Sequence, residues 1–387
     1  MKILGIETSC DETAASVVEV APDNSYVTLL STVTATSLNL HAKTGGIIPE
    51  IAARNQIKDI IPVIYEALEK AQVLTAPSDA TIPKIDAIAV TYGPGLIGSL
   101  LVGVETAKTL SYIWEKPLIP VNHLFGHIYA AWIQVPDSFQ NSSLHRITYS
   151  SQRLSNTEPT ITLPQFPAIG LIISGGHTDL ILMKNHAETV WLGGTRDDAA
   201  GEAFDKIGRM INFPYPAGPA IEAAAKNGDP KRFHFPRPLM YDKHFDFSFS
   251  GLKTAVLREV EKLKNESSTD QYDRSQGITL DTQTIADISR GVQDAISDVI
   301  IYKTVLATEK YGAKSIIIGG GVAANQTLKN SLQQALDTKS LLSHVELFSP
   351  QKFLCTDNAS MIACAAAFIG EKSAWKDLIA NPELYFD

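Results

Sequence analysis

Residues 3–20, ILGIETSCDETAASVVEV, decide the fold class of this 387-residue chain. The first four are apolar, residues 7–13 are small and polar, and residues 14–20 are largely apolar and β-branched, so the segment predicts two strands joined by a polar loop. Residues 169–182, IGLIISGGHTDLIL, repeat this pattern. Two similar hairpins about half a chain apart indicate an internal duplication.

Strands and helices alternate outside the two hairpins, which predicts an α/β protein. Strands are expected at residues 85–90, 118–121 and 315–319, and helices at 47–73, 96–114, about 123–133, 199–211, 218–227 and 285–311. We also expect two lobes. Lobe I comprises residues 1–120 and the C-terminal helices at 358–387, and lobe II comprises residues 121–357, with an exposed insertion at 136–165 and a helical insertion at 195–280.

The composition excludes several classes of protein. Hydrophobic residues make up 44% of the chain and charged residues 19%, which is enough apolar material for a large core. Asp and Glu total 42 against 33 Lys and Arg, so a general positive surface for nucleic acid is not expected. No apolar run reaches the length of a membrane span, the three cysteines form no CxxC pair, and the first residues enter a strand at once. We therefore expect a cytoplasmic protein with no membrane segment and no cleaved leader.

Three glycine-rich loops follow predicted strands. Residues 93–98, GPGLIG, match the dinucleotide fingerprint GxGxxG, but no acidic residue ends the next strand to hold a ribose, and Pro94 removes an amide donor. A tight strand-to-helix turn packed against neighbouring backbone is therefore favoured there. Residues 174–178, SGGHT, and 319–325, GGGVAAN, can approach an anion or a flat base closely. Together the loops predict a nucleotide-like ligand.

Two histidines form a candidate metal site. His123 and His127 are four residues apart on a predicted helix, so both imidazoles lie on the same helix face and can bind a transition metal. The alternatives are histidines that are hydrogen-bonded in the core or solvated. A metal site needs a third ligand, and Asp357, at the start of a late helix, is the best candidate, although an N-cap role would also suit it.

Two further segments place polar groups beside aromatic ones. Asp205 follows Phe204 one turn into a predicted helix, where it can accept hydrogen bonds from ligand hydroxyls. Residues 245–254 alternate aromatic and polar side chains, which favours a half-buried strand over a nucleic-acid surface. Six basic residues nearby predict a local positive patch, namely Arg232, His234, Arg237, Lys243, His244 and Lys253.

In this order, the motifs resemble those of the universal family that synthesises threonylcarbamoyladenosine in tRNA. The resemblance runs through GIETSCDET at 5–13, GGIIPE at 45–50, GPGL at 93–96, the histidine pair, SGGHT at 174–178, residues 198–206, FSFSGLKT at 247–254, GGVAAN at 320–325 and CTDN at 355–358. The chain departs from the family pattern at Phe125, where most members have an acidic residue, and at Glu222, which is often Asp. Its insertion at 136–165 is longer than the family pattern leads us to expect.

The resemblance implies a two-lobed fold similar to actin, the heat-shock ATPases and the sugar kinases, with duplicated ribonuclease-H-like halves. It implies transfer of a threonylcarbamoyl group from threonylcarbamoyl-AMP to the exocyclic amine of adenosine 37, next to the anticodon, in tRNAs that read ANN codons. One divalent metal ion, Fe²⁺ or Zn²⁺, is expected on His123, His127 and Asp357. The implied adenylate contacts are Ile172, Ile173, Ser174, Gly175, Gly176, Asp205, Gly218, Glu222 and Asn325.

The same resemblance implies a catalytic role for the first polar loop and a set of partners. Asp11 or Glu12 would accept the proton of the attacking amine, with a structural role for both as the alternative. The partners are tRNA, an inactive paralogue of the same fold (TsaB-like) and a small P-loop ATPase (TsaE-like). Two other functions stay open from the sequence: an actin-like ATPase or small-molecule kinase, and a nucleotide-binding scaffold subunit of a tRNA-modifying complex. No hydrolytic constellation supports a protease.

Overall fold

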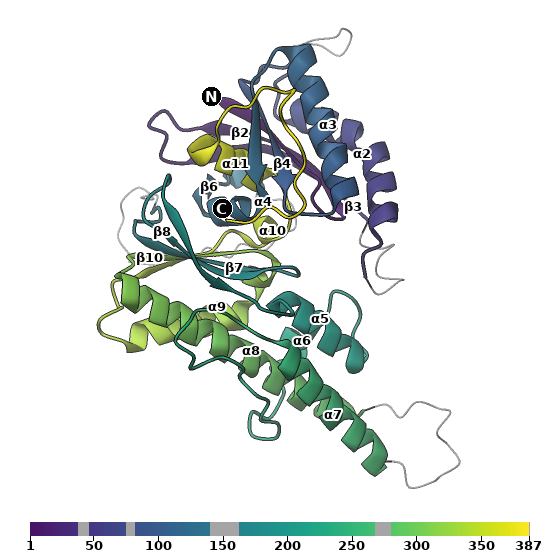
Figure 1. The fold of residues 1–387 in the computed structure, drawn as a ribbon, viewed down its shortest axis with the longest axis vertical. Helices are drawn as coiled ribbons and strands as arrows, with labels where there is room; N and C mark the ends of the chain where they lie inside the picture. The colour runs from purple at the N-terminus through teal and green to yellow at the C-terminus, as the bar shows by residue number, and fades with distance from the viewer. Residues whose placement is uncertain (38–45, 75–81, 140–161, 268–279, 387) are drawn as a thin grey trace. The chain divides into compact units, whose positions relative to one another are not determined.

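The computed structural model describes residues 1–37, 46–74, 82–139, 162–267 and 280–386 (Figure 1). Its contacts divide the chain into two compact units. Unit 1 contains Met1–Gln165, His186–Glu188 and Phe348–Asp387, and unit 2 contains Phe166–Asn185 and Thr189–Leu347. Among the described residues, no helix combines the length and the apolar character needed to cross a membrane.

Unit 1 is built on a six-stranded sheet with the order β5-β4-β1-β2-β3-β6. The central strand β1 pairs antiparallel with β2 and parallel with β4. The strands are β1 (Lys2–Glu7), β2 (Glu12–Val20), β3 (Val27–Thr36), β4 (Ala87–Gly93), β5 (Leu118–Asn122) and β6 (Ile133–Gln134), and the helices are α2 (Pro49–Lys70), α3 (Ile97–Trp114), α4 (His123–Tyr129), α10 (Lys352–Cys355) and α11 (Ala359–Ile369). Because β1, β4 and β5 are parallel, their carboxyl ends meet at one edge of the sheet.

Helices cover both faces of this sheet. In β1, Leu4 and Ile6 point into the core formed with α2 and α3, which lie side by side (Figure 1). The intervening Gly5 points the other way, and a Cβ atom there would lie 2.2 Å from the carbonyl oxygen of Ala359 in α11. Since successive strand residues face opposite sides, α11 covers the second face, and only glycine at position 5 allows so close an approach.

Unit 2 repeats the arrangement around a five-stranded sheet with the order β11-β10-β7-β8-β9. Here β7 pairs antiparallel with β8 and parallel with β10, as β1 does with β2 and β4. The strands are β7 (Ala168–Ile173), β8 (Thr178–Met183), β9 (Thr189–Gly194), β10 (Ser315–Gly319) and β11 (Glu346–Phe348), and the helices are α5 (Ala200–Met210), α6 (Gly218–Ala225), α7 (Ser250–Ser267), α8 (Thr282–Tyr311) and α9 (Gln326–Thr338). The repeated pairing confirms the duplication expected from the two hairpins.

Some segments differ from the sequence-based expectation. The contacts group residues 121–139 and 348–357 with unit 1, whereas the sequence analysis assigned them to lobe II. In the first of these segments, β5 extends the first sheet beside β4 and α4 packs against α11. Most of the expected insertion at 136–165 lies outside the described residues. The alternating segment at 245–249 buries its phenylalanines, but only Phe247 pairs, in an isolated bridge with Thr195, so the segment is not a strand.

Candidate functional site: a histidine–aspartate cluster

The cluster is positioned by the starts of two helices in unit 1. Asn122 ends β5 and caps α4, since its Oδ1 accepts a hydrogen bond from the Leu124 amide at 2.8 Å, so His123 is the first residue of the helix. Asp357 lies just before α11. The two helices pack closely at Gly126, where a Cβ atom would lie 2.8 Å from Ile362 of α11. The small residue at position 126 therefore lets the start of α11 approach the histidine face of α4.

Three ligand-type atoms converge at this point. Asp357 Oδ1 lies 3.4 Å from His123 Nε2 and 3.3 Å from His127 Nε2. The two imidazole rings are 4.6 Å apart between centroids and nearly perpendicular, and one ligand atom from each residue lies within 4.8 Å of the other two. Both histidines are buried, and the Asp357 side chain is 24% exposed. Two nitrogens and one oxygen at this separation form a donor set suited to a divalent transition metal.

The bonding state of His127 supports this interpretation. Its side chain is 1% exposed, yet within the described part of the chain neither of its ring nitrogens has a hydrogen-bond partner. Its Nε2 lies 3.3 Å from Asp357 Oδ1, close enough for an ion pair. A buried polar group without a partner costs free energy. A divalent cation bound by this nitrogen would satisfy it, so the residues fit a metal.

The charges of the cluster favour the protonation states that metal binding requires at His127 and Asp357, and they favour a protonated His123. Burial lowers the pKa of His127, so this imidazole is neutral. Burial alone would raise the pKa of Asp357, but the two histidines lower it well below its usual range, so this carboxylate is ionised. Burial opposes charge on His123, yet the carboxylates of Glu7 and Asp357 together raise its pKa well above the usual value. A bound metal would displace the proton that His123 carries on Nε2, which faces Asp357.

The polar loop between β1 and β2 lies beside the cluster. Its backbone is held by Gln56 of α2, whose Nε2 donates to the carbonyl oxygens of Cys10 and Glu12 at 3.1 and 2.8 Å. Burial and the nearby charges of Asp357 and Asp11 raise the pKa of Glu12 well above its usual value. The loop therefore brings Glu12, one of the two candidate proton acceptors, close to Asp357.

The GPGLIG segment at 93–98 packs against the loop between β1 and β2. A Cβ atom on Gly95 would lie 2.5 Å from the carbonyl oxygen of Ser9. The next amide, that of Leu96, donates to the same oxygen at 2.8 Å. The interpretation of these residues as a tight turn packed against neighbouring backbone is therefore confirmed.

Unit 2 holds the residues expected to contact an adenylate. Ile172 and Ile173 are buried in β7, and the loop that follows exposes Gly175 and Gly176. A Cβ atom on either glycine would have no neighbour within 4 Å, whereas one on Gly201 would lie 2.5 Å from the carbonyl oxygen of Ser174. The start of α5 is thus packed against this loop, while the glycine edge of the loop stays open.

Four other predicted contacts, Asp205, Gly218, Glu222 and Asn325, lie at the starts of α6 and α9 or bond to them. Asp205 Oδ1 accepts a hydrogen bond from the Ala217 amide, next to Gly218, at 2.7 Å. Glu222 Oε1 accepts from the Thr327 amide at 2.9 Å, and Asn325 Oδ1 accepts from the Leu328 amide at 2.9 Å. These side chains organise the starts of α6 and α9. A ligand bound by these side chains would contact groups that also hold helix starts, a structural role that the sequence did not reveal.

The predicted positive patch is largely neutralised. Four of its six basic residues lie within 2.8 to 3.4 Å of a carboxylate: Arg232 with Asp287, Arg237 with Asp298, His244 with Asp242, and Lys253 with Asp198. The acidic partners come from distant positions in the chain or from short-range turns that composition alone does not show. Carboxylates therefore pair with four of the six residues of the expected patch.

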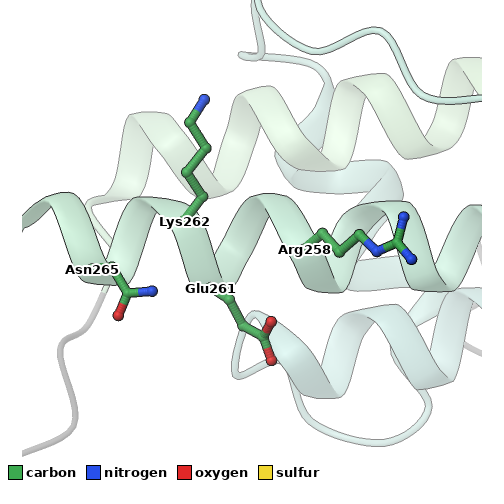
Figure 2. Close-up of a pocket in the computed structure, with 4 residues that line it drawn as sticks. All are labelled: Arg258, Glu261, Lys262 and Asn265. Carbon is green, nitrogen blue, oxygen red and sulfur yellow. The ribbon is translucent and has the colours of Figure 1, made fainter.

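The structure also contains a groove that no motif predicted. It has a volume of about 450 Å³ and is lined by Arg258, Glu261, Lys262 and Asn265 on α7. Figure 2 shows Lys262 pointing away from Glu261 and Asn265, so the four side chains do not converge on one point. This groove offers no organised set of catalytic or metal-binding groups.

Comparison with known proteins identifies the fold and the family. A profile of the TsaD family, tRNA N6-adenosine threonylcarbamoyltransferase, matches residues 28–144 and 142–364. Proteins of that name from Thermomicrobium roseum and Moorella thermoacetica are 43% and 42% identical, over 98% and 95% of this chain and 94% and 91% of their own lengths.

Among solved structures, full-length HypF in its phosphate- and nucleotide-bound form matches 97% of this chain and 56% of its own, with a TM-score of 0.53 and 13% identity. With the duplicated sheets, this likeness confirms the two-lobed α/β fold of actin, the heat-shock ATPases and the sugar kinases. Together with the nearly full-length relatives, the motifs and the matched profile lead to one assignment: the chain belongs to the TsaD family of tRNA N6-adenosine threonylcarbamoyltransferases.

Proposed function

We propose that this chain transfers the threonylcarbamoyl group of threonylcarbamoyl-AMP to the exocyclic amine of adenosine 37 in tRNAs that read ANN codons. In this reaction a bond forms between the amine nitrogen and the carbamoyl carbon, and the bond from that carbon to the phosphate oxygen breaks. AMP leaves, and the amine gives up one proton. The observation that carries the proposal is the convergence of His123, His127 and Asp357 beside the acidic loop, in a chain of this family.

The reactants determine what the protein must supply. The donor is a mixed carbamic–phosphoric anhydride, so AMP is already a good leaving group. The adenine amine is a poor nucleophile because its lone pair is delocalised into the ring. Catalysis therefore consists mainly of positioning the amine against the carbonyl carbon and stabilising the charge that develops on the carbonyl oxygen or the phosphate.

We propose His123, His127 and Asp357 as the ligands of one Fe²⁺ or Zn²⁺ ion. When bound, a cation with three protein ligands and open positions supplies Lewis-acid stabilisation of developing negative charge. The buried, neutral His127 and the ionised Asp357 are already in the states that such a site requires.

We propose Glu12 as the acceptor of the amine proton, with Asp11 as the alternative. A general base works best when its pKa lies near the working pH. The carboxyl of Glu12 meets this condition better than an ordinary glutamate, because burial and its acidic neighbours raise its pKa. Gln56 fixes the backbone on which this side chain is carried.

The adenylate is proposed to bind in unit 2. The open edge at Gly175 and Gly176 leaves room for the close approach of a phosphate or ribose, and the Gly321 position is equally free of neighbours within 4 Å. Ile172, Ile173, Ser174, Asp205, Gly218, Glu222 and Asn325 complete the proposed set.

The proposed partners are tRNA, a paralogue of the same fold and a small P-loop ATPase. One feature of α2 supports a protein partner: Ile57, Ile61 and Tyr65 form a stripe four residues apart and are 65%, 57% and 48% exposed. A run of large apolar side chains on one exposed helix face is typical of an interaction surface, and we assign it to the paralogue. A tRNA substrate places the proposed reaction in the cytoplasm.

The test compares His127→Ala with the native chain in a transfer assay that uses preformed threonylcarbamoyl-AMP, tRNA and the purified partners. We expect the variant to lose both bound metal and transfer while its thermal unfolding curve is retained. A surface variant, Asp294→Asn, serves as the control because it removes only an ion pair within α8. Normal tRNA modification by His127→Ala would disprove the proposed metal role, and steady ATP hydrolysis without transfer would support a kinase or ATPase instead.

A further inference from the structure

Glu7 is a buried acid for which the proposed reaction has no direct use. It is the last residue of β1 and is 1% exposed. Its Oε1 accepts a hydrogen bond from the Ser9 amide at 2.5 Å, and its Oε2 accepts one from the Thr91 hydroxyl at 2.5 Å and lies 2.9 Å from His123 Nδ1. A buried carboxylate is stable only when such donors satisfy it. Here the donors come from the loop after β1, from β4 and from α4.

These contacts determine which nitrogen of His123 carries the hydrogen. Because the Ser9 amide and the Thr91 hydroxyl already donate to Glu7, the carboxylate acts as an acceptor, and His123 Nδ1 is the donor. When a metal displaces the second proton of His123, the lone pair of the neutral ring is on Nε2, which lies 3.4 Å from Asp357 Oδ1. Two electron-rich atoms facing each other at this distance favour a cation between them.

The second histidine lacks this support. Within the described part of the chain, Nδ1 of His127 has no hydrogen-bond partner. No carboxylate therefore holds Nδ1 of His127 as Glu7 holds Nδ1 of His123, and His123 is the better oriented of the two imidazoles.

We propose that Glu7 is a positioning residue, whose carboxylate holds the Nδ1–H of His123 so that Nε2 is presented to a divalent metal. The inference rests on the proposed metal site and adds a residue outside its ligand set. A carboxylate bonded to the far nitrogen of a metal-binding imidazole fixes the ring and raises its basicity, and losing it typically weakens metal affinity by about 10- to 100-fold.

Glu7→Gln is the informative substitution because it preserves the volume of the side chain. If the amide oxygen faces His123, the amide NH₂ faces the Ser9 amide, and two donors oppose each other. If the amide is reversed, NH₂ faces Nδ1 and favours the tautomer with its hydrogen on Nε2, which blocks that nitrogen as a ligand. Either orientation disfavours the arrangement that binds metal.

The experiment measures Zn²⁺ affinity by competition with a chromogenic chelator for the full chain and three variants. The matched control is Asp287→Asn, since Asp287 is equally buried and also accepts three hydrogen bonds, from the Asp229 amide, Arg232 and Gln283. We expect Glu7→Gln to bind Zn²⁺ about 10- to 100-fold more weakly, His127→Ala to lose binding, and Asp287→Asn to match the native chain.

The outcomes separate the two hypotheses. If the native chain binds no Zn²⁺, or if His127→Ala binds as tightly as the native chain, the metal site itself is wrong, and the role of Glu7 is overturned with it. If His127→Ala loses binding while Glu7→Gln retains native affinity, only the role of Glu7 is overturned.

A second measurement needs no variant and so does not depend on whether Glu7→Gln folds. Long-range ¹H–¹⁵N NMR of the Zn²⁺-loaded native chain reports the state of each imidazole nitrogen. We expect His123 to show a protonated Nδ1 and a metal-bound Nε2. A metal-bound Nδ1, or a proton on Nε2, would overturn the proposal.

Discussion

The loops of the two duplicated hairpins occupy the same place in the topology but have opposite chemistry. The end of β1, the loop that follows it and the start of β2 carry Glu7, Asp11 and Glu12, whereas the loop between β7 and β8 carries Gly175 and Gly176. The acidic loop is buried beside the histidine–aspartate cluster, and the glycine loop is open. The two halves thus share a strand framework and differ in the chemistry of the loops that it carries.

The duplication extends to the turn beside each loop. Gly95, after β4, would place a Cβ atom 2.5 Å from the Ser9 carbonyl oxygen, and Gly320, after β10, would place one 2.4 Å from the Ile173 carbonyl oxygen. Each glycine follows the strand that runs parallel to the first strand of its hairpin. The backbone of both halves is therefore similarly constrained, while the loop side chains have diverged.

The largest expected effect comes from removing the acid that completes the cluster. Asp357→Ala should reduce Zn²⁺ affinity and threonylcarbamoyl transfer by more than about 100-fold, because a lost ligand costs more than a lost outer-shell contact. Both quantities are measured with Asp294→Asn as control. Transfer within a few-fold of native would mean that the acidic loop functions without the cluster.

The shared turns should respond alike to substitution. Gly95→Ala and Gly320→Ala should each lower the free energy of unfolding by about 1–3 kcal/mol, because the new methyl group meets backbone that has to move. Gly176→Ala, which meets nothing within 4 Å, should change it by less than about 0.5 kcal/mol. Urea unfolding measures all three. If Gly320→Ala leaves the free energy of unfolding unchanged while Gly95→Ala lowers it, the two turns are not equivalent.

A larger side chain in the loop between β7 and β8 tests whether AMP binds there. Gly176→Val should weaken AMP binding by about 10-fold, or about 1.4 kcal/mol, if the ligand approaches the backbone there. Isothermal calorimetry measures the affinity, and Gly251→Ala, whose new Cβ atom would make only an ordinary 3.7 Å contact, is the control. Unchanged AMP affinity in Gly176→Val would move the proposed adenylate site elsewhere.

The smallest effect concerns an acid outside both loops. Asp197 accepts hydrogen bonds from the amides of Phe249 and Ser250 at the start of α7. Asp197→Ala should lower the free energy of unfolding by about 1 kcal/mol at pH 7, which is typical of a lost helix cap. Burial alone would raise the pKa of Asp197, but bonds from Ser248, Phe249 and Ser250 lower it. The contribution of ionised Asp197 to the stability of the fold is thus present above about pH 4, near the pKa of an Asp in the unfolded chain. It is lost as the pH falls through the lowered value.

Urea unfolding at several pH values between 7 and 3 checks this prediction. The stability difference between Asp197→Ala and the native chain should shrink at the acidic end. A difference that stays constant over the whole range would show that the Asp197 charge makes no contribution.

Local patterns predicted the parts of the molecule that local spacing determines. The i, i+4 spacing of His123 and His127 placed both rings on one helix face, and the repeated apolar–polar–apolar pattern predicted both hairpins. The structure brings Asp357 to the histidines, as the sequence analysis expected.

Contacts that depend on strand order could not be predicted in this way. Glu7 meets Thr91 and His123 only because β1, β4 and β5 are parallel neighbours, and the sequence does not state that order. The capping of α7 by Asp197 likewise joins residues about fifty positions apart. Such pairings leave no local periodicity, so the sequence analysis missed both acids as organising residues.

X-ray absorption spectroscopy of the Zn²⁺-loaded native chain and of His127→Ala identifies the atoms that bind the metal. We expect one zinc ion per chain with two imidazole ligands and oxygen donors in the native protein. We expect no comparable bound zinc in the variant. An unchanged spectrum in His127→Ala, or a first shell containing the sulfur of Cys10, would contradict the proposed metal site.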